Sequence, residues 1–300
     1  MRRRKKKLRR TRSGFPKKLF IILGAVAVIV IASLLLTLYR RPPQIDERNT
    51  QKNLPLDVKK ELETSTPSAT FRVPILLYHY VEYVKDPKDT IRQSLDIVPS
   101  VFEKQLQTLI ADNYTFITPS GLADVLEGKK KLPPKPIIIT FDDGYRDFYT
   151  DVLPILQRYP DVRVVAYVVP GFLDTPNFLL TSQLEEIAQS NQVEIAAHTM
   201  HHLWLKGMSK DRAQKEISQS KTTLEDLLHI PIVSFAYPYG AFDSQTVQMV
   251  KDAGFKTAVS TIPGIEVNQA DRFFLYRIRP GARTGKELIN FLSQNAFRPW

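Results

Sequence analysis

Two adjacent carboxylates, Asp142 and Asp143, follow the apolar segment PIIITF and precede Gly144. Neighbouring acids repel each other, so such a pair is tolerated where a cation separates them, or where one binds a metal and the other handles protons. The glycine permits a tight turn that would direct both carboxylates into one cavity. The DDG triplet alone is more often an ordinary turn that caps the next helix, so a metal site needs further ligands.

Three of the chain's 5 histidines, His198, His201 and His202, lie in the segment VEIAAHTMHH. Two imidazoles four residues apart on a turn can bind one ion and leave part of its coordination open. Together with Asp143, His198 and His202 would form a His/His/Asp site with room for water, which is typical of a catalytic metal. His201 is the alternative ligand. The chain has no Cys, so any metal site must use His, Asp or Glu.

A third segment, VSFAYPYGAFD, places residues 237–240 after another apolar run. Alone it is a turn. Beside the acids and histidines, however, Pro238 and Tyr239 would form a rigid wall for a sugar ring, and a backbone N–H there could bind an oxyanion. Trp204 and Trp300 are further candidates for sugar contacts, although a Trp more often serves packing.

The segments that carry these residues are apolar runs that alternate with helical stretches from residue 71 onward. Alternation of this kind predicts an α/β fold, with a parallel sheet and helices outside it. About seven such units favour a distorted (β/α)7-type barrel, in which chemistry gathers at the C-terminal ends of the strands. The predicted strands are 72–81, 115–118, 136–141, 162–169, 193–199, 232–238, 256–261 and 274–279, and the predicted helices are 101–112, 121–128, 148–159, 180–190, 209–229, 244–254 and 284–294.

The net charge of +11 is concentrated at the N-terminus. Residues 1–41 hold 13 of the 42 Lys and Arg and no acid, so the remaining 29 basic residues face 31 acidic ones. A body so close to neutrality argues against a surface that binds nucleic-acid phosphates.

Residues 19–39 contain no charge over 21 positions. At about 1.5 Å per residue this run spans the roughly 30 Å hydrocarbon core of a bilayer. The basic residues 1–18 before it favour a cytoplasmic N-terminus. We therefore expect a single-pass signal anchor in the cell membrane, a polar stalk over residues 40–70 and an extracytoplasmic domain over residues 71–300. A signal peptide cleaved near residues 32–33 is the alternative, but the apolar run is long for one.

The three motifs, in this order, resemble the polysaccharide deacetylase family, or NodB homology domain. TFDDG matches the first family motif, and His198-Thr199-x-x-His202 matches the second, H-(S/T)-x-x-H. The third motif, R-x-P-Y, is matched by residues 236–239 except that Ala236 replaces the arginine. The resemblance covers about residues 71–300. It implies a distorted β/α barrel, a divalent metal that is usually zinc, and removal of N-acetyl groups from N-acetylglucosamine polymers.

Carried over residue by residue, the resemblance implies that Asp143, His198 and His202 are metal ligands. It also implies that Asp142 is the general base and that Tyr239 provides a backbone donor to the oxyanion. The arginine that orients the base in the family must come from elsewhere. Arg277 and Arg279, in the last predicted strand, are the candidates.

The family's C-terminal Leu-x-His, whose histidine is the general acid, is also missing from its usual place. After His202 the sequence contains only His229, which precedes the third motif. Leu77-Tyr78-His79 supplies the pattern at the N-terminal end of the domain instead, as in a permuted subgroup that deacetylates poly-N-acetylglucosamine. Because moving one strand from the end of a barrel to its beginning leaves its position in the ring unchanged, we expect His79 to be the general acid.

These observations predict a membrane-anchored, metal-dependent hydrolase that cleaves the amide of an extracytoplasmic acetylated glycan. Peptidoglycan, poly-N-acetylglucosamine and chitin-type oligomers all remain candidate substrates. An inactive deacetylase barrel that only binds glycans is one alternative. A deacetylase for another acetylated carbohydrate, such as O-acetylated xylan, is a second. No protein partner is predicted.

Overall fold

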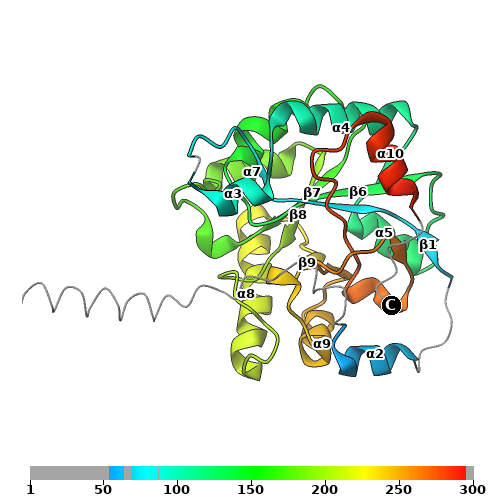
Figure 1. The fold of residues 1–300 in the computed structure, drawn as a ribbon. Helices are drawn as coiled ribbons and strands as arrows, with labels where there is room; N and C mark the ends of the chain where they lie inside the picture. Colours follow the sequence, from blue (N-terminus) through cyan, green and yellow to red (C-terminus); the bar gives the residue numbers. More distant parts are fainter. Residues whose placement is uncertain (1–53, 64–68, 87, 295–300) are drawn as a thin grey trace, which may run out of the picture. The chain divides into compact units, whose positions relative to one another are not determined.

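The computed structural model describes residues 54–63, 69–86 and 88–294 (Figure 1). The predicted anchor at residues 19–39 lies outside this range and remains a prediction. Among the described residues, no helix combines the length and hydropathy needed to cross a bilayer. Part of the predicted stalk is helical, since α2 spans Leu56–Glu63. There the buried Val58 joins the core, and Asp57 accepts a hydrogen bond from the Ser244 amide.

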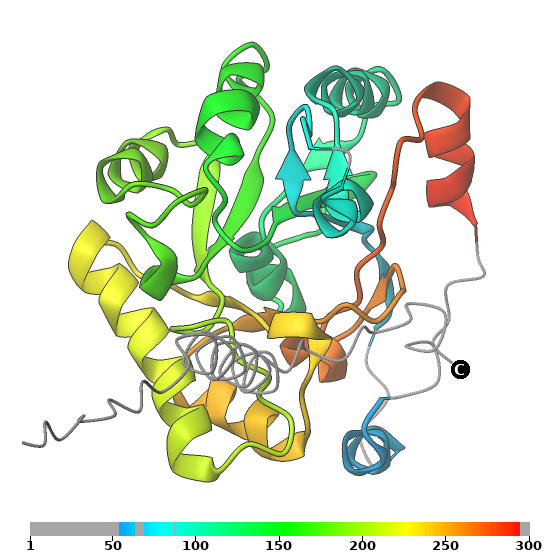
Figure 2. The same cartoon turned by 60° about the vertical axis from the view of Figure 1, so that its left-hand side comes forward.

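A sheet of parallel strands forms the centre of the described domain (Figures 1 and 2). Its order is β10-β9-β8-β7-β6-β2, and β5 also pairs with β6. The predicted α/β class with parallel strands is confirmed. The strands are β2 (Ile75–Tyr78), β5 (Thr115–Phe116), β6 (Pro136–Phe141), β7 (Val164–Val168), β8 (Val193–Ala197), β9 (Ser234–Ala236) and β10 (Thr257–Val259).

Residues 275–278 link the two edge strands of this sheet. Leu275 forms a parallel bridge with Val259 of β10, and Ile278 forms one with Leu76 of β2. The Ile278 amide donates to the Ile75 carbonyl at 2.9 Å. The predicted final strand is therefore reduced to single bridges on either side. It still gives the N-terminal and C-terminal ends of the domain a common neighbour, as a distorted barrel requires.

Helices surround the strands (Figure 2). One predicted helix, residues 148–159, is interrupted: a π-helical turn over Phe148–Val152 precedes the short α6 (Leu153–Leu156). Pro154 lacks the N–H that a continuous helix needs. The other elements are α3 (Thr90–Leu95), α4 (Pro99–Ala111), α5 (Pro119–Leu126), α7 (Thr181–Gln189), α8 (Lys210–Leu228), α9 (Ser244–Asp252), α10 (Gly285–Ser293), the short strands β1 (Phe71–Arg72), β3 (Tyr80–Val81), β4 (Asp96–Ile97) and β11 (Glu266–Val267), and the 3₁₀ turns Pro170–Phe172, Pro238–Gly240 and Ala270–Phe273.

Side chains on alternate positions of β6 enter two different apolar clusters. Ile138 packs with one cluster, while Ile137 and Ile139 pack with the other, between sheet and helices. Because both faces of the strand are buried, its sequence is continuously apolar rather than alternating. Polar side chains are accommodated where the strand ends, and there the candidate site begins.

Candidate active site

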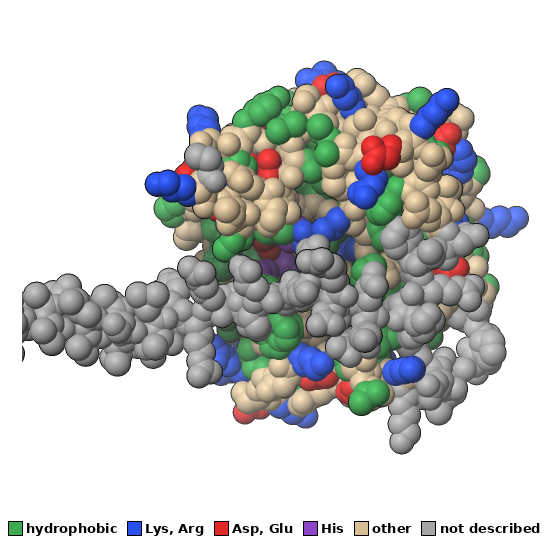
Figure 3. Space-filling view, viewed as in Figure 1, with side chains coloured by type: hydrophobic (Ala, Val, Ile, Leu, Met, Phe, Trp, Pro, Cys, Tyr) green, Lys and Arg blue, Asp and Glu red, His purple; other side chains and the backbone are tan. Residues whose placement is uncertain are grey.

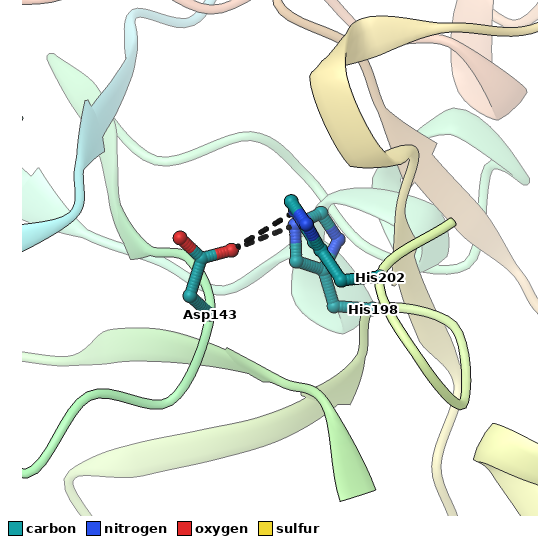
Figure 4. A group of neighbouring side chains, drawn as sticks. All are labelled: Asp143, His198 and His202. Atoms are coloured by element: carbon teal, nitrogen blue, oxygen red, sulfur yellow. Dashed lines mark ion pairs between the residues drawn. The ribbon is translucent and has the colours of Figure 1, made fainter. Parts of the chain in front are cut away.

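The ends of β6 and β8 bring Asp143, His198 and His202 together, and all three side chains point toward one another (Figure 4). Nε2 of His198 lies 3.3 Å, and Nε2 of His202 3.2 Å, from Oδ1 of Asp143. Ligand atoms of the three residues lie within 4.8 Å of one another. The structure thus groups the three residues predicted to bind a metal.

The ring of His198 is oriented by a hydrogen bond from its far side. Its Nδ1 lies 2.8 Å from the carbonyl oxygen of Ala236 in β9. Because a carbonyl only accepts, Nδ1 carries the proton and Nε2 presents its lone pair toward Asp143. This is the arrangement that a histidine ligand requires.

The three residues fit a divalent cation. Oδ1 of Asp143 is buried and has no hydrogen-bond donor among the described residues, although two imidazole nitrogens face it. Burial would raise the pKa of Asp143, but the neighbouring His202 and His198 hold that pKa well below its usual value. Burial would lower the pKa of His202, and the charge of Asp143 raises it instead. One carboxylate and two imidazoles are ligands that suit zinc.

Arg277 supplies the cation that the third motif lacks. Its Nη1 and Nη2 each lie 2.7 Å from a different carboxylate oxygen of Asp142. The guanidinium is 2% exposed and also donates to the carbonyl of Ser260 at 2.8 Å. Burial would raise the pKa of Asp142, but the Arg277 charge holds it below its ordinary value, so this carboxylate is ionised at neutral pH. Of the two arginines suggested by the sequence, Arg277 takes this position.

His79 follows β2 at the same rim of the sheet. Tyr78 pairs with Phe141 across the sheet, and the Asp142 amide donates to the Tyr78 carbonyl at 3.0 Å. Partial burial lowers the pKa of His79 to about 4, although the negative charges of Asp143 and Asp142 act to raise it. The predicted general acid is therefore placed beside the predicted base.

Two aromatic rings extend outward from the candidate ligand His202. The Tyr239 ring centroid lies 4.6 Å from that of His202, and the Trp204 centroid lies 5.9 Å from that of Tyr239. Trp204 is 37% exposed, and Tyr239 lies in a turn with φ of 59° directly after the buried Pro238. In Figure 3, histidine and acidic side chains are visible at the floor of a hollow, with basic side chains at its edge. Trp300 lies outside the described residues.

The family model described as polysaccharide deacetylase matches residues 129–258. YxkH of Bacillus subtilis (strain 168), provisionally named a polysaccharide deacetylase, is 28% identical over 240 residues, which cover 79% of this chain and 82% of YxkH. The poly-beta-1,6-N-acetyl-D-glucosamine N-deacetylase of Staphylococcus epidermidis is 24% identical over 273 residues, or 84% of this chain and 91% of that one. The solved structure of the Streptococcus pyogenes deacetylase PplD in complex with acetate superimposes with a TM-score of 0.69 and 28% identity, covering 75% of this chain and all of PplD.

Residues 129–258 match the polysaccharide deacetylase family, and the two relatives named above, which align with most of the chain, bear polysaccharide deacetylase names. The predicted family and the predicted enzyme class, a deacetylase among the hydrolases, are confirmed. The site described above therefore belongs to a polysaccharide deacetylase fold.

Two residues of the deacetylase site escaped sequence reasoning. Tyr145 follows the DDG turn, where burial and then the charge of Asp143 raise its pKa, and its ring stacks on Tyr80 at 3.8 Å. Its position directly after the first motif was an available signal. Glu216 binds the ring of His201 with an Nδ1–Oε1 distance of 2.9 Å. His201, the alternative ligand, is thus directed away from the Asp143 group, and no local pattern in the sequence announces this.

Proposed function

We propose that this protein is a metal-dependent N-deacetylase of an extracytoplasmic polysaccharide containing N-acetylglucosamine. The observation that carries the proposal is the ionised Asp142, held by Arg277 beside the group of Asp143, His198 and His202. The name of the Staphylococcus epidermidis relative supports the substrate class. The uncharged run at residues 19–39 supports an extracytoplasmic location.

Asp143, His198 and His202 would hold the metal, and we assign zinc from the ligand types. When bound, zinc supplies polarisation of the amide carbonyl and lowers the pKa of water toward about 7. Asp142 accepts a proton from the attacking water, whose oxygen forms the new bond to the acetyl carbon. Arg277 holds the carboxylate in one orientation and keeps it ionised until that transfer.

Two further groups complete the reaction. The backbone N–H of Tyr239 donates to the oxygen that becomes negatively charged. His79 is neutral in the free protein. The negative charge that develops on the substrate oxygen during the reaction raises the affinity of His79 for a proton. Asp142 then passes the proton it received from water to His79, and we assign His79 its donation to the nitrogen as the carbon–nitrogen bond breaks. The products are acetate and a free amino sugar.

The exposed face of Trp204 provides a surface beside the site on which a neighbouring sugar ring could lie. Aromatic rings offer a large apolar area at small entropic cost, and pyranose rings have apolar faces that can cover them. The Tyr239 ring contacts the rings of both Trp204 and His202. A sugar ring stacked on Trp204 would therefore lie close enough to the site to neighbour, in the same glycan, the sugar being deacetylated.

An inactive glycan-binding barrel was the alternative that the missing arginine suggested. Arg277 fills that role, which favours the active enzyme. Substrate chemistry is decided by measuring acetate release by the full-length protein in detergent. The panel is β-1,4- and β-1,6-linked N-acetylglucosamine oligomers, peptidoglycan and O-acetylated xylan, each with and without a chelator.

Release from an N-acetylated glycan that stops with chelator and returns with zinc is the expected result. Release from xylan alone would instead identify an ester deacetylase. Bound zinc without any acetate release would support the inactive barrel.

A further inference from the structure

The loop from His198 to His202 contains two residues in the left-handed backbone region. Thr199 has φ of 62° and His202 has φ of 54°. This conformation is unusual for non-glycine residues, above all for a β-branched Thr. It persists only where the surroundings hold it. Because His202 carries a predicted metal ligand, the contacts that hold this loop also place that ligand.

Glu216, on the middle of α8, holds the loop from one side. Its Oε2 accepts from the His201 amide at 2.8 Å, and its Oε1 accepts from Nδ1 of His201 at 2.9 Å. Its backbone carbonyl accepts from the Met200 amide at 3.0 Å. Glu216 is only 6% exposed, so these bonds form away from competing water.

The 3₁₀ turn Pro170–Phe172 holds the loop from the other side. The Gly171 amide donates to the Met200 carbonyl at 3.0 Å. A Cβ at Gly171 would overlap that carbonyl oxygen and would lie 2.9 Å from Cδ2 of His201. Only glycine permits this approach, so the loop is enclosed between α8 and the turn.

We propose that Glu216 and His201 act as a positioning pair that preorganises His202 for metal binding. The inference rests on the proposed function, because it requires Asp143, His198 and His202 to bind a metal. Hydrogen bonds to a buried carboxylate are stronger than those between neutral groups. Partners that orient metal ligands from behind commonly change metal affinity when they are removed. His201, which the sequence offered as an alternative ligand, thus serves the neighbouring ligand instead.

The test is the zinc dissociation constant of the full-length protein, measured by competition with a chromophoric chelator. Glu216→Gln preserves shape but cannot accept both bonds from His201. We expect it to raise the zinc dissociation constant about 10- to 100-fold. His201→Leu should have a similar effect. His201→Asn, whose amide nitrogen can replace Nδ1 as a donor, should restore most of the affinity.

Glu225→Gln is the matched control. Glu225 lies on the same helix and binds a loop amide in the same manner, at Ile232, but away from the site. The zinc affinity of the Glu225→Gln protein should equal that of the wild type. The melting temperatures of all variants without metal show whether each one is folded. If both Glu216→Gln and His201→Leu bind zinc within twofold of the wild type, the positioning role is refuted. A wild-type protein that binds no zinc would refute the proposed function itself.

Discussion

Arg277 donates two hydrogen bonds to the carboxylate of Asp142, each 2.7 Å long, although the two residues are 135 positions apart in the sequence. Arg277 belongs to the segment that bridges β10 and β2, whereas the family's arginine would stand at Ala236 in β9. The same carboxylate is therefore reached from a different strand position. The fork geometry holds both oxygens, which a single point charge could not do.

Arg277→Lys should lower kcat/KM by at least about 100-fold, because the base loses its orienting fork. Arg277 also lowers the pKa of Asp142. Its removal in Arg277→Met should raise that pKa, so the acidic limb of the kcat/KM profile should move to higher pH. Breaking a buried ion pair costs about 3–5 kcal/mol of stability, so melting temperatures must accompany the kinetics.

Arg158→Lys is the control for this substitution, since Arg158 is exposed and pairs with Glu103 at 2.8 Å. Its kinetics should match those of the wild type. An Arg277→Lys enzyme that is folded and equally active would show that the fork is unnecessary.

His79→Asn should retain the metal but lose about 10²- to 10⁴-fold in kcat, as expected for removal of a general acid. Metal content is measured by elemental analysis and turnover by acetate release. His229→Asn is the matched control, because His229 caps α8 in a left-handed conformation that Asn tolerates. Near-normal turnover by the His79 variant would exclude the assigned role.

Trp204→Ala should raise KM for an N-acetylglucosamine pentamer about tenfold, equivalent to about 1.4 kcal/mol of lost binding. Hydrolysis of a small chromogenic acetate ester, which cannot reach the platform, should stay unchanged. Trp204→Phe should recover much of the loss. Equal KM values for the pentamer in wild type and Trp204→Ala would remove the platform from the binding model.

Asp147 predicts a pH dependence of stability. Burial, together with the charge of Glu82, raises its pKa to about 7, against the lowering effect of a hydrogen bond from the Val81 amide. The folded protein therefore holds this proton more tightly than the unfolded chain, whose Asp pKa is about 3.9. The resulting stabilisation is complete below pH 4 and is lost as pH rises through about 7, with a slope of up to about 1.4 kcal/mol per pH unit.

Asp147→Asn keeps a carbonyl acceptor for Val81 but does not titrate. Its free energy of unfolding should therefore fall less than that of the wild type between pH 4 and 7. Urea unfolding across this range measures the difference, and parallel curves for the two proteins would contradict the shift.

Some of the deacetylase site was accessible from local sequence. Asp143, His198 and His202 each follow an apolar run, and parallel strands bring such run ends to one edge of the sheet. The four-residue spacing favoured His202 over His201. The structure agrees, because the ring of His201 is hydrogen-bonded to Glu216 instead. Two departures were not anticipated. The interruption near Pro154 follows from its missing N–H, a local signal that the helix prediction passed over. The reduction of the last strand to single bridges depends on how it meets β10 and β2, which are distant in sequence.

By itself, the sequence determined the main strands and helices along the chain and the set of candidate ligands, since apolar periodicity and residue spacing are local properties. Tertiary structure alone decided which distant charges meet. Arg277 and Arg279 were equal candidates by sequence, and Glu216 was one acid among many on a charged helix. A buried charge is stable only where a partner of correct geometry reaches it. That condition depends on how the bridging segment meets β2 and on where α8 packs, which no short stretch of sequence encodes.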